Sequence, residues 1–348
     1  MTDIITLQQK IAPELIELME RRYTILRHVS HSQPVGRRTL ANDLNLGERV
    51  VRSELDFLKN QGLLEGDAGG VRLTREGDYL IHELSEFIKD LRGLLDIEIR
   101  IREILGLEHV IVIPGDSDND ELVKKEIGRA AARYLLGALR GGSIIAVTGG
   151  TTVGEVAKAV PVSHSPRDIL VVPARGGLGE DVEIQANTIA AKIAKRLMAS
   201  YRLLHVPDNV GEDAMNSLIK DQHIRDIIRT IKSADILIHG IGNAEELSVG
   251  RGDSAEETGR LVKAGAVGEA FGHYFARDGT IVRNIHSLGI RVNDLKRIRH
   301  VIGVGGGRKK ADAILSVLST GLETALVTDE AAGKAILENI VPQNPGFG

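Results

Sequence analysis

The chain has 348 residues, a length that favours two domains and is ample for a large buried core. It contains no cysteine, which excludes disulfides and thiolate metal sites, and no uncharged run long enough to cross a bilayer, so we expect a soluble cytoplasmic protein without membrane contact. The net charge of −4 requires any basic surface to be local, and an aromatic content of 3% disfavours stacking platforms for single-stranded nucleic acids.

Residues 1–75 are predicted to form a mostly helical first domain. An amphipathic pattern over residues 13–31 indicates a helix, and a turn follows at residues 33–36. Helices over Arg38–Leu44 and Glu48–Asn60, joined by a tight turn, have helix-turn-helix spacing. Two short β-like runs around residues 67–70 predict a hairpin, so the domain is expected to be a winged helix-turn-helix.

The second helix of this pair is predicted to be a recognition helix. Its apolar residues at positions 51, 55 and 58 share a face that we expect to point into the core. Arg49, Arg52 and Ser53 lie on the opposite face, where they suit base edges of double-stranded DNA. Further basic residues are expected on phosphates or in the neighbouring groove: Arg37, Arg38, Lys59, Arg72 and Arg75. An exposed basic face is often only solvated surface. The alternative to DNA binding is therefore a winged helix that binds another protein.

Residues 76–108 are predicted to form a linking helix. Its apolar residues follow a heptad-like spacing: Leu80, Leu84, Phe87, Leu91, Leu94, Ile101 and Leu105. A seam beside a DNA-binding domain favours a homo-oligomer, a dimer or a dimer of dimers on DNA, because two-fold proteins commonly bind two half-sites. The alternative is a helix that packs along its own chain, and Gly93 argues against a long uninterrupted coiled coil.

Residues 109–343 are predicted to form a doubly wound, Rossmann-like α/β domain. Short β-branched runs alternate with helical patterns, which is typical of a mostly parallel sheet covered by helices. The predicted strands are His109–Ile113, Ser143–Thr148, Ile169–Pro173, Tyr201–Val206, Asp235–Gly240, His300–Val304 and Thr324–Thr328. The predicted helices are Asp120–Leu139, Val153–Ala159, Gln185–Met198, Asp221–Lys232, Lys309–Leu318 and Ala331–Glu338.

The stretch "TGGTTVGE", residues 148–155, follows one predicted strand and has the glycine spacing of a nucleotide-binding P-loop. Glu155 and Val156 stand where such a loop needs Lys and Ser or Thr, so Mg²⁺-nucleotide binding is excluded. Glycine turns followed by a helix still attract anions through free backbone N–H groups. We therefore predict a phosphate site to which the hydroxyls of Thr151 and Thr152 contribute, although both could be helix caps only.

Two more strand-to-helix junctions, "PARGGLGEDV" and "VGGGRKKA", add glycines and the cations Arg175 and Lys310. Because ligands of doubly wound sheets lie beyond the carboxyl ends of the strands, these loops should meet at one edge. The loop "HGIGNAEELSVGRGDS" could add Arg251, and Glu269 is a candidate acceptor for a sugar hydroxyl. Each glycine turn by itself could be plain turn chemistry; together they favour an anion site, without a metal.

The loops "TGGTT", "PARGGLGEDV", "HGIG" and "VTDEAA", with "SYRLLHVP", resemble those of the SorC-type bacterial sugar-responsive transcription regulators. The resemblance covers essentially the whole chain. It implies a repressor of a glycolytic operon whose effector domain is similar in fold to sugar-phosphate isomerases and binds fructose 1,6-bisphosphate or a related sugar phosphate. It also implies, position by position, the ligand contacts Gly149, Gly150, Thr151, Thr152, Arg175, Gln185, Arg251, Glu269 and Lys310.

The alternative is an enzyme, a sugar-phosphate isomerase or deaminase-like domain with a regulatory head. Such chemistry needs a positioned base, for which Glu269, Asp329 and His239 are available. None of the three lies in a recognisable catalytic motif, so we expect a sensor with no catalytic residue and no cofactor other than its effector.

Overall fold

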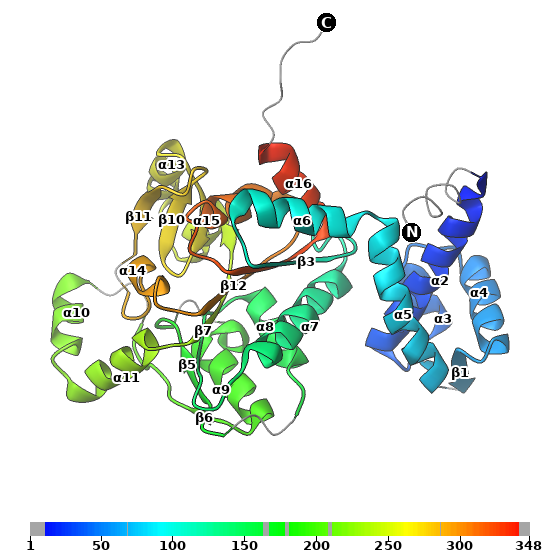
Figure 1. The fold of residues 1–348 in the computed structure, drawn as a ribbon, viewed down its shortest axis with the longest axis horizontal. Coiled ribbons are helices and arrows are strands. Elements are labelled where there is room, and N and C mark those ends of the chain that lie inside the picture. Colours follow the sequence, from blue (N-terminus) through cyan, green and yellow to red (C-terminus); the bar gives the residue numbers. More distant parts are fainter. Residues whose placement is uncertain are drawn as a thin grey trace, which may run out of the picture. The chain divides into compact units, whose positions relative to one another are not determined.

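A computed structural model of the chain describes residues 11–67, 69–162, 167–177, 181–207, 211–285 and 287–340. Two compact units make up the chain, Met1–Leu95 and Asp96–Gly348 (Figure 1). Each unit has its own hydrophobic core.

The first unit is a winged helix-turn-helix domain, as the sequence predicts. Its strands β1 and β2 pair antiparallel and form the wing. Its elements are α2 (Pro13–Ser32), α3 (Arg37–Asp43), α4 (Glu48–Asn60), β1 (Leu64–Asp67), β2 (Gly70–Leu73) and α5 (Arg75–Leu91).

Helix α4 is held in this unit by its apolar face. Val51, Leu55 and Leu58 are buried in a cluster that includes Ile25 of α2 and Leu40 of α3. The expectation that this face points into the core is confirmed. The opposite, polar face of α4 is consequently left at the surface.

The segment 76–108, expected as one linking helix, contains two helices. Helix α5 ends at Leu91 and α6 (Leu94–Leu105) begins after Gly93, whose φ of +64° is a conformation that only glycine adopts readily. In the first unit, Ile88 and Leu91 pack with Tyr23 of α2. In the second unit, Ile97 and Ile101 of α6 lie against Gly333. The heptad-like row therefore serves packing within the chain, and the oligomer stays a prediction.

The second unit is built on a seven-stranded parallel sheet, which confirms the α/β prediction (Figure 1). The strand order is β3-β13-β12-β7-β4-β5-β6. The strands are β3 (His109–Ile113), β4 (Ile144–Val147), β5 (Leu170–Pro173), β6 (Ser200–Tyr201), β7 (Ile236–Gly240), β12 (His300–Val304) and β13 (Ala325–Asp329). The chain runs outward from β4 through β5 to β6 and outward from β7 through β12 to β13, so the topology reverses between β4 and β7.

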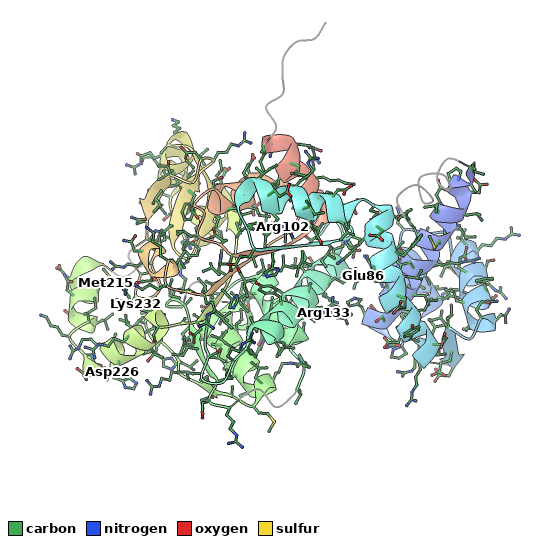
Figure 2. The ribbon with its side chains drawn as sticks, viewed as in Figure 1. Glu86, Arg102, Arg133, Met215, Asp226 and Lys232 are labelled. Atoms are coloured by element: carbon green, nitrogen blue, oxygen red, sulfur yellow. The ribbon has the colours of Figure 1, made fainter. Side chains whose placement is uncertain are left out.

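Helices cover both faces of this sheet. Helices α7 (Glu121–Ala138), α8 (Thr151–Ala159) and α9 (Ala186–Leu197) lie side by side on one face, and their apolar residues share one core with the strands. Across the sheet lie α15 (Ala311–Leu318) and α16 (Glu330–Ile340), which pack on each other. The outer faces are polar: Arg102 of α6 and Arg133 of α7 are exposed beside buried neighbours (Figure 2).

A second, antiparallel sheet of four strands, inserted between β7 and β12, was not predicted. Its order is β11-β10-β9-β8. The insertion comprises β8 (Gly242–Asn243), α12 (Ala244–Gly250), α13 (Ala255–Lys263), β9 (Ala266–Ala270), β10 (His273–Ala276) and β11 (Ile281–Asn284). It carries both Arg251 and Glu269.

The remaining elements are short helices and one shortened strand. The helices are α10 (Glu212–Leu218), α11 (Gln222–Lys232), α14 (Val292–Leu295), η1 (Val182–Ile184) and η2 (Arg308–Lys310). The strand expected over residues 201–206 was wrong beyond Tyr201. The backbone nitrogen of Leu204 donates to Oδ1 of Asn187 at 3.1 Å, and the carbonyl oxygen of Leu204 accepts from Nδ2 of Asn187 at 3.0 Å. Leu204 therefore does not extend the ladder with β5.

Candidate functional site

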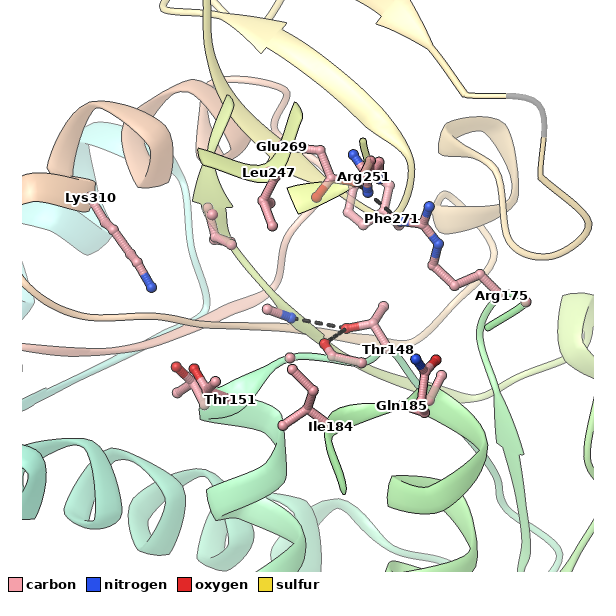
Figure 3. A pocket seen from close by; sticks show the side chains of 18 residues that line it. Thr148, Thr151, Arg175, Ile184, Gln185, Leu247, Arg251, Glu269, Phe271 and Lys310 are labelled. Carbon is pink, nitrogen blue, oxygen red and sulfur yellow. Dashed lines mark hydrogen bonds and ion pairs between the residues drawn. The ribbon is translucent and has the colours of Figure 1, made fainter. Parts of the chain in front are cut away.

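A pocket of about 260 Å³ opens at the carboxyl ends of β4 and β7, where the strand order reverses. This is the place where doubly wound sheets bind ligands. The structure brings all nine predicted ligand contacts to this one pocket (Figure 3). They are Gly149, Gly150, Thr151, Thr152, Arg175, Gln185, Arg251, Glu269 and Lys310.

One wall of the pocket is the turn from β4 into α8. Gly149 passes so close to the neighbouring loop that a Cβ would lie 2.7 Å from the carbonyl oxygen of Ile184, and Gly150 has a φ of +120°. Gly150, the N-cap of α8, has no side chain to cap the helix, so the N–H groups at its first turn are open to an acceptor from the pocket. Thr151 is exposed and Thr152 is buried, and both line the cavity. This wall offers backbone donors, hydroxyls and the positive end of a helix dipole.

Lys310 forms a second wall, at the turn from β12 into α15. The turn is fixed by the buried carboxylate of Asp329, which accepts hydrogen bonds from the backbone nitrogens of Gly307 at 2.7 Å, Ser117 at 2.8 Å and Ala332 at 2.9 Å. Burial lowers the pKa of Lys310, although nearby carboxylates, Glu246 foremost, act to raise it. Among the described residues no carboxylate comes within 4.0 Å of the Lys310 ammonium, which leaves it available to an anion.

Arg175, Arg251 and Glu269 form the third wall. One oxygen of Glu269, Oε1, accepts from Arg251 at 2.7 Å, Arg175 at 3.1 Å and the Gly272 backbone nitrogen at 2.8 Å. Burial would raise the pKa of Glu269, but the charges of Arg251 and Arg175 lower it below its ordinary value. Two guanidinium groups therefore meet at one carboxylate in this wall.

The pocket also has apolar lining that the sequence did not indicate. Ile184, Leu247 and Phe271 face the cavity together with the polar side chain of Gln185 (Figure 3). Apolar residues in such loops are indistinguishable from core residues in the sequence alone. The result is a small cavity with polar groups on several sides and apolar contacts between them, as expected for a small-molecule site.

The residues considered as catalytic bases have structural roles. Asp329 is occupied by three backbone amides. His239 is fully buried, and burial lowers its pKa to about 4, while its Nε2 lies 3.7 Å from Oε1 of the equally buried Glu323. Burial raises the pKa of Glu323 to about 7. Neither His239 nor Asp329 lines the pocket, and Glu269 is held by two arginines, so none is poised to take a proton from a substrate.

The predicted DNA contacts all lie at the surface of the first unit. Exposed side chains are found at Arg37, Arg38, Arg49, Arg52, Ser53, Lys59, Arg72 and Arg75. Arg37, Arg52 and Lys59 line a shallow hollow between α4 and the wing. Their carboxylate neighbours are few: Arg52 approaches Asp56 at 4.0 Å and Arg38 approaches Glu48 at 3.8 Å, both in the open. Exposed pairs of this kind are weak and leave the arginines free to exchange partners.

Among the described residues, none of the helices is both long and apolar enough to span a bilayer. Nor do these residues contain a group of three or more histidine and acidic side chains placed to hold a metal ion.

Comparison with known proteins identifies both units. A family model described as "Putative sugar-binding domain" matches residues 89–338, and one described as "CggR N-terminal DNA binding domain" matches residues 18–88. The "Central glycolytic genes regulator" of Priestia megaterium is 43% identical over 340 residues, covering 97% of this chain and 99% of that protein. Its namesake in Bacillus subtilis is 41% identical over 339 residues, covering 97% and 100%.

A solved structure agrees. The "putative SorC family transcriptional regulator" from Enterococcus faecalis has a TM-score of 0.65 and 36% sequence identity, over 70% of this chain and 99% of that one. The DNA-binding and sugar-binding matches together span nearly all of the described residues, and the relatives are named as regulators. The chain therefore belongs to the SorC-type family of sugar-responsive transcription regulators and is a DNA-binding regulator, not a sugar-phosphate enzyme.

Proposed function

We propose that this protein represses glycolytic genes by binding operator DNA through its first unit, and that fructose 1,6-bisphosphate in the pocket of the second unit controls that binding. The relatives named as central glycolytic genes regulators support the choice of target genes. The protein acts where the bacterial chromosome is, in the cytoplasm, as a homo-oligomer that binds two half-sites.

The observation that carries the effector proposal is the distribution of positive charge around the cavity. Lys310 lies on one side, and Arg175 with Arg251 on the other, with the Thr151 turn along the floor between them (Figure 3). Two separated cationic groups suit a ligand with a phosphate at each end. The cavity, about 260 Å³, is smaller than most ligand sites, which span roughly 300–1,000 Å³, and this size fits a phosphorylated hexose better than a dinucleotide.

The polar groups between the two ends suit a sugar. Gln185 and the Thr151 hydroxyl face the cavity, and the free oxygen of Glu269 is an acceptor for a hydroxyl. An ionised carboxylate accepts but does not donate, so Glu269 favours a sugar hydroxyl beside it over a third phosphate.

On the DNA side, Arg49, Arg52 and Ser53 are proposed to contact base edges from the exposed face of α4, and the remaining basic residues to contact phosphates. The two sites are linked thermodynamically. An effector that weakens operator binding must itself bind less tightly to the DNA-bound protein, by the same factor.

The test is a calorimetric titration of the full chain with fructose 1,6-bisphosphate, fructose 6-phosphate, glucose 6-phosphate and free fructose. We expect the bisphosphate to bind most tightly and free fructose not to bind. The effector proposal is wrong if no sugar phosphate binds, or if a monophosphate binds as tightly as the bisphosphate.

A second titration, with DNA from upstream of a glycolytic operon, tests the coupling. We expect operator affinity to change at least fivefold when the bisphosphate is present, the lower limit of ordinary allosteric coupling. Unchanged affinity at saturating effector would show that the pocket does not control DNA binding.

A further inference from the structure

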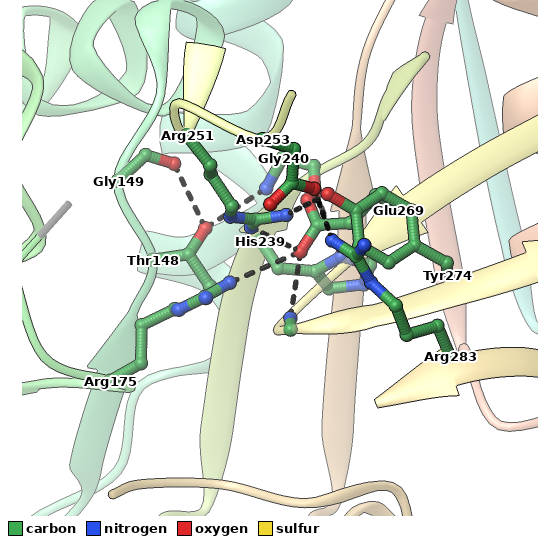
Figure 4. A network of polar contacts seen from close by, with 11 residues as sticks. Thr148, Gly149, Arg175, His239, Gly240, Arg251, Asp253, Glu269, Tyr274 and Arg283 are labelled. Carbon is green, nitrogen blue, oxygen red and sulfur yellow. Dashed lines mark hydrogen bonds and ion pairs between the residues drawn. The ribbon is translucent and has the colours of Figure 1, made fainter. Parts of the chain in front are cut away.

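Arg251 belongs to a network of polar contacts, several of whose members do not line the pocket (Figure 4). Arg251 follows the last residue of α12, and its side chain is only 3% exposed. Its Nη2 donates to Glu269, and its Nη1 donates to the hydroxyl of Tyr274 at 2.8 Å. Tyr274, in β10, is fully buried and does not line the pocket.

Further contacts hold the ring of Tyr274 in place. The guanidinium of Arg283, in β11, lies 4.6 Å from the ring centroid, within cation–π range. Arg283 forms an ion pair with Asp253. Asp253 also accepts from the hydroxyl of Ser248 at 2.6 Å, and Ser248 belongs to α12, the helix that leads into Arg251.

The contacts therefore close a ring from Arg251 through Tyr274, Arg283, Asp253 and Ser248 back to α12, the helix that ends just before Arg251. A free arginine side chain loses rotamer entropy when a ligand fixes it, and this loss weakens binding. In this protein the guanidinium is fixed before any ligand arrives, which is the condition for preorganised binding.

One donor of the Arg251 guanidinium is not used by these contacts. The guanidinium groups of Arg251 and Arg283 are paired with the carboxylates of Glu269 and Asp253. The Nε–H of Arg251 is buried and has no acceptor among the described residues, so an oxygen atom supplied by a ligand would satisfy it.

We propose that Tyr274, supported by the Arg283–Asp253 ion pair, is a positioning residue that holds the Arg251 guanidinium for one phosphate of the effector without touching the effector itself. This inference rests on the proposed function, since it assigns the support for one end of the same site. It makes Tyr274 a determinant of the preference for bisphosphates over monophosphates that bind only at Lys310.

The experiment is a double-mutant cycle on the full chain, read by calorimetric titration with fructose 1,6-bisphosphate. Tyr274→Phe removes only the hydroxyl and keeps the ring beside Arg283. We expect it to weaken binding about tenfold, the effect of one lost hydrogen bond to a charged group. In an Arg251→Ala background the same change should have no further effect, whereas in a Lys310→Ala background the tenfold loss should persist.

This comparison separates positioning from general damage to the fold. A merely structural tyrosine would weaken binding equally in both backgrounds, which would overturn the inference, as would unchanged affinity of the single variant. If Arg251→Ala does not fold, Arg251→Lys takes its place, because an ammonium cannot reproduce the two directed bonds to Tyr274 and Glu269.

Failure of the proposed function is recognised separately. If the unaltered protein binds no sugar phosphate, the effector is wrong, and the same cycle is measured with inorganic phosphate as the probe, by thermal stabilisation. Loss of phosphate stabilisation in Tyr274→Phe that depends on Arg251 would still support the positioning role. Loss that is independent of Arg251, or no stabilisation by phosphate at all, would refute it.

Discussion

Replacing Lys310 with methionine should weaken effector binding strongly while leaving the empty protein at least as stable. The change keeps the length of the side chain and removes its charge. In the empty pocket the ammonium is desolvated, which lowers its pKa, and no described carboxylate within 4.0 Å compensates it. A methionine there avoids that cost, because it has no charge to desolvate.

The magnitude follows from this geometry. A hydrogen bond to a charged group is worth about 1.5–3 kcal/mol, and a phosphate at Lys310 would gain a partner that is already partly stripped of water. We therefore expect the dissociation constant for fructose 1,6-bisphosphate to rise about 10- to 150-fold in Lys310→Met.

The pH dependence gives the sign of the electrostatic contribution. Because the pKa of Lys310 is lowered in the empty protein and a bound phosphate would raise it, binding takes up a proton at alkaline pH. Affinity of the unaltered protein should therefore fall as the pH rises through the lowered pKa of Lys310. The methionine variant should lack that fall.

The assay is calorimetric titration at several pH values, with thermal unfolding of the empty protein alongside. Lys309→Met is the matched control, since its exposed side chain adjoins Lys310 but does not line the pocket. Equal affinities of Lys310→Met and the unaltered protein would refute the reasoning. So would a lower melting temperature of the empty variant, which would show that Lys310 has a stabilising partner.

Three further predictions concern other parts of the molecule. Gly149→Ala should abolish ligand-induced thermal stabilisation, because the new Cβ would lie 2.7 Å from the Ile184 carbonyl oxygen. Gly154→Ala should keep that stabilisation, because its Cβ meets no atom nearer than 4.0 Å. Equal thermal stabilisation of the two variants would contradict the prediction. Arg52→Ala should weaken operator binding by about 1–3 kcal/mol in a fluorescence anisotropy titration. Arg260→Ala, on α13 of the other unit, is the control and should leave operator binding unchanged. Equal losses in both variants would mean that only the overall charge of the protein matters. Glu323→Gln should become more stable relative to the unaltered protein as the pH rises from 4.5 to about 7. Burial raises the pKa of Glu323, so the folded protein keeps a proton that the unfolded chain releases in this pH range. A difference in the free energy of urea unfolding that stays constant across these pH values would refute the prediction.

Much of the large sheet could be predicted because its strands are apolar runs ended by glycines. His300–Val304 precedes three consecutive glycines, and its bounds agree with β12. The antiparallel insertion has no such pattern. Its β8 is two residues long, and the turn between β9 and β10 places Phe271 at a φ of +39°, a conformation that phenylalanine rarely adopts and that its sequence does not signal.

In the site, too, residues with a local sequence signal could be predicted, and a residue whose role depends on the fold could not. Glycine turns with threonines and cations are visible in the sequence because their chemistry is local, and these residues do meet at one pocket. Tyr274 could not be found in this way. It lies in a short, mostly buried strand, where a tyrosine is ordinarily a core residue. Its bond to Arg251 depends on the fold, because the two residues are 23 positions apart.

The pocket draws its donors from turns that each leave a different buried strand: β4, β5, β7 and β12. The rigid framework and the chemical surface are thus separable. One turn can be exchanged or lengthened while the strands beneath it stay in register, so the same architecture can be adapted to sugars of other shapes by small local steps. A scaffold of this kind allows its ligands to diversify without any change in its DNA-binding unit.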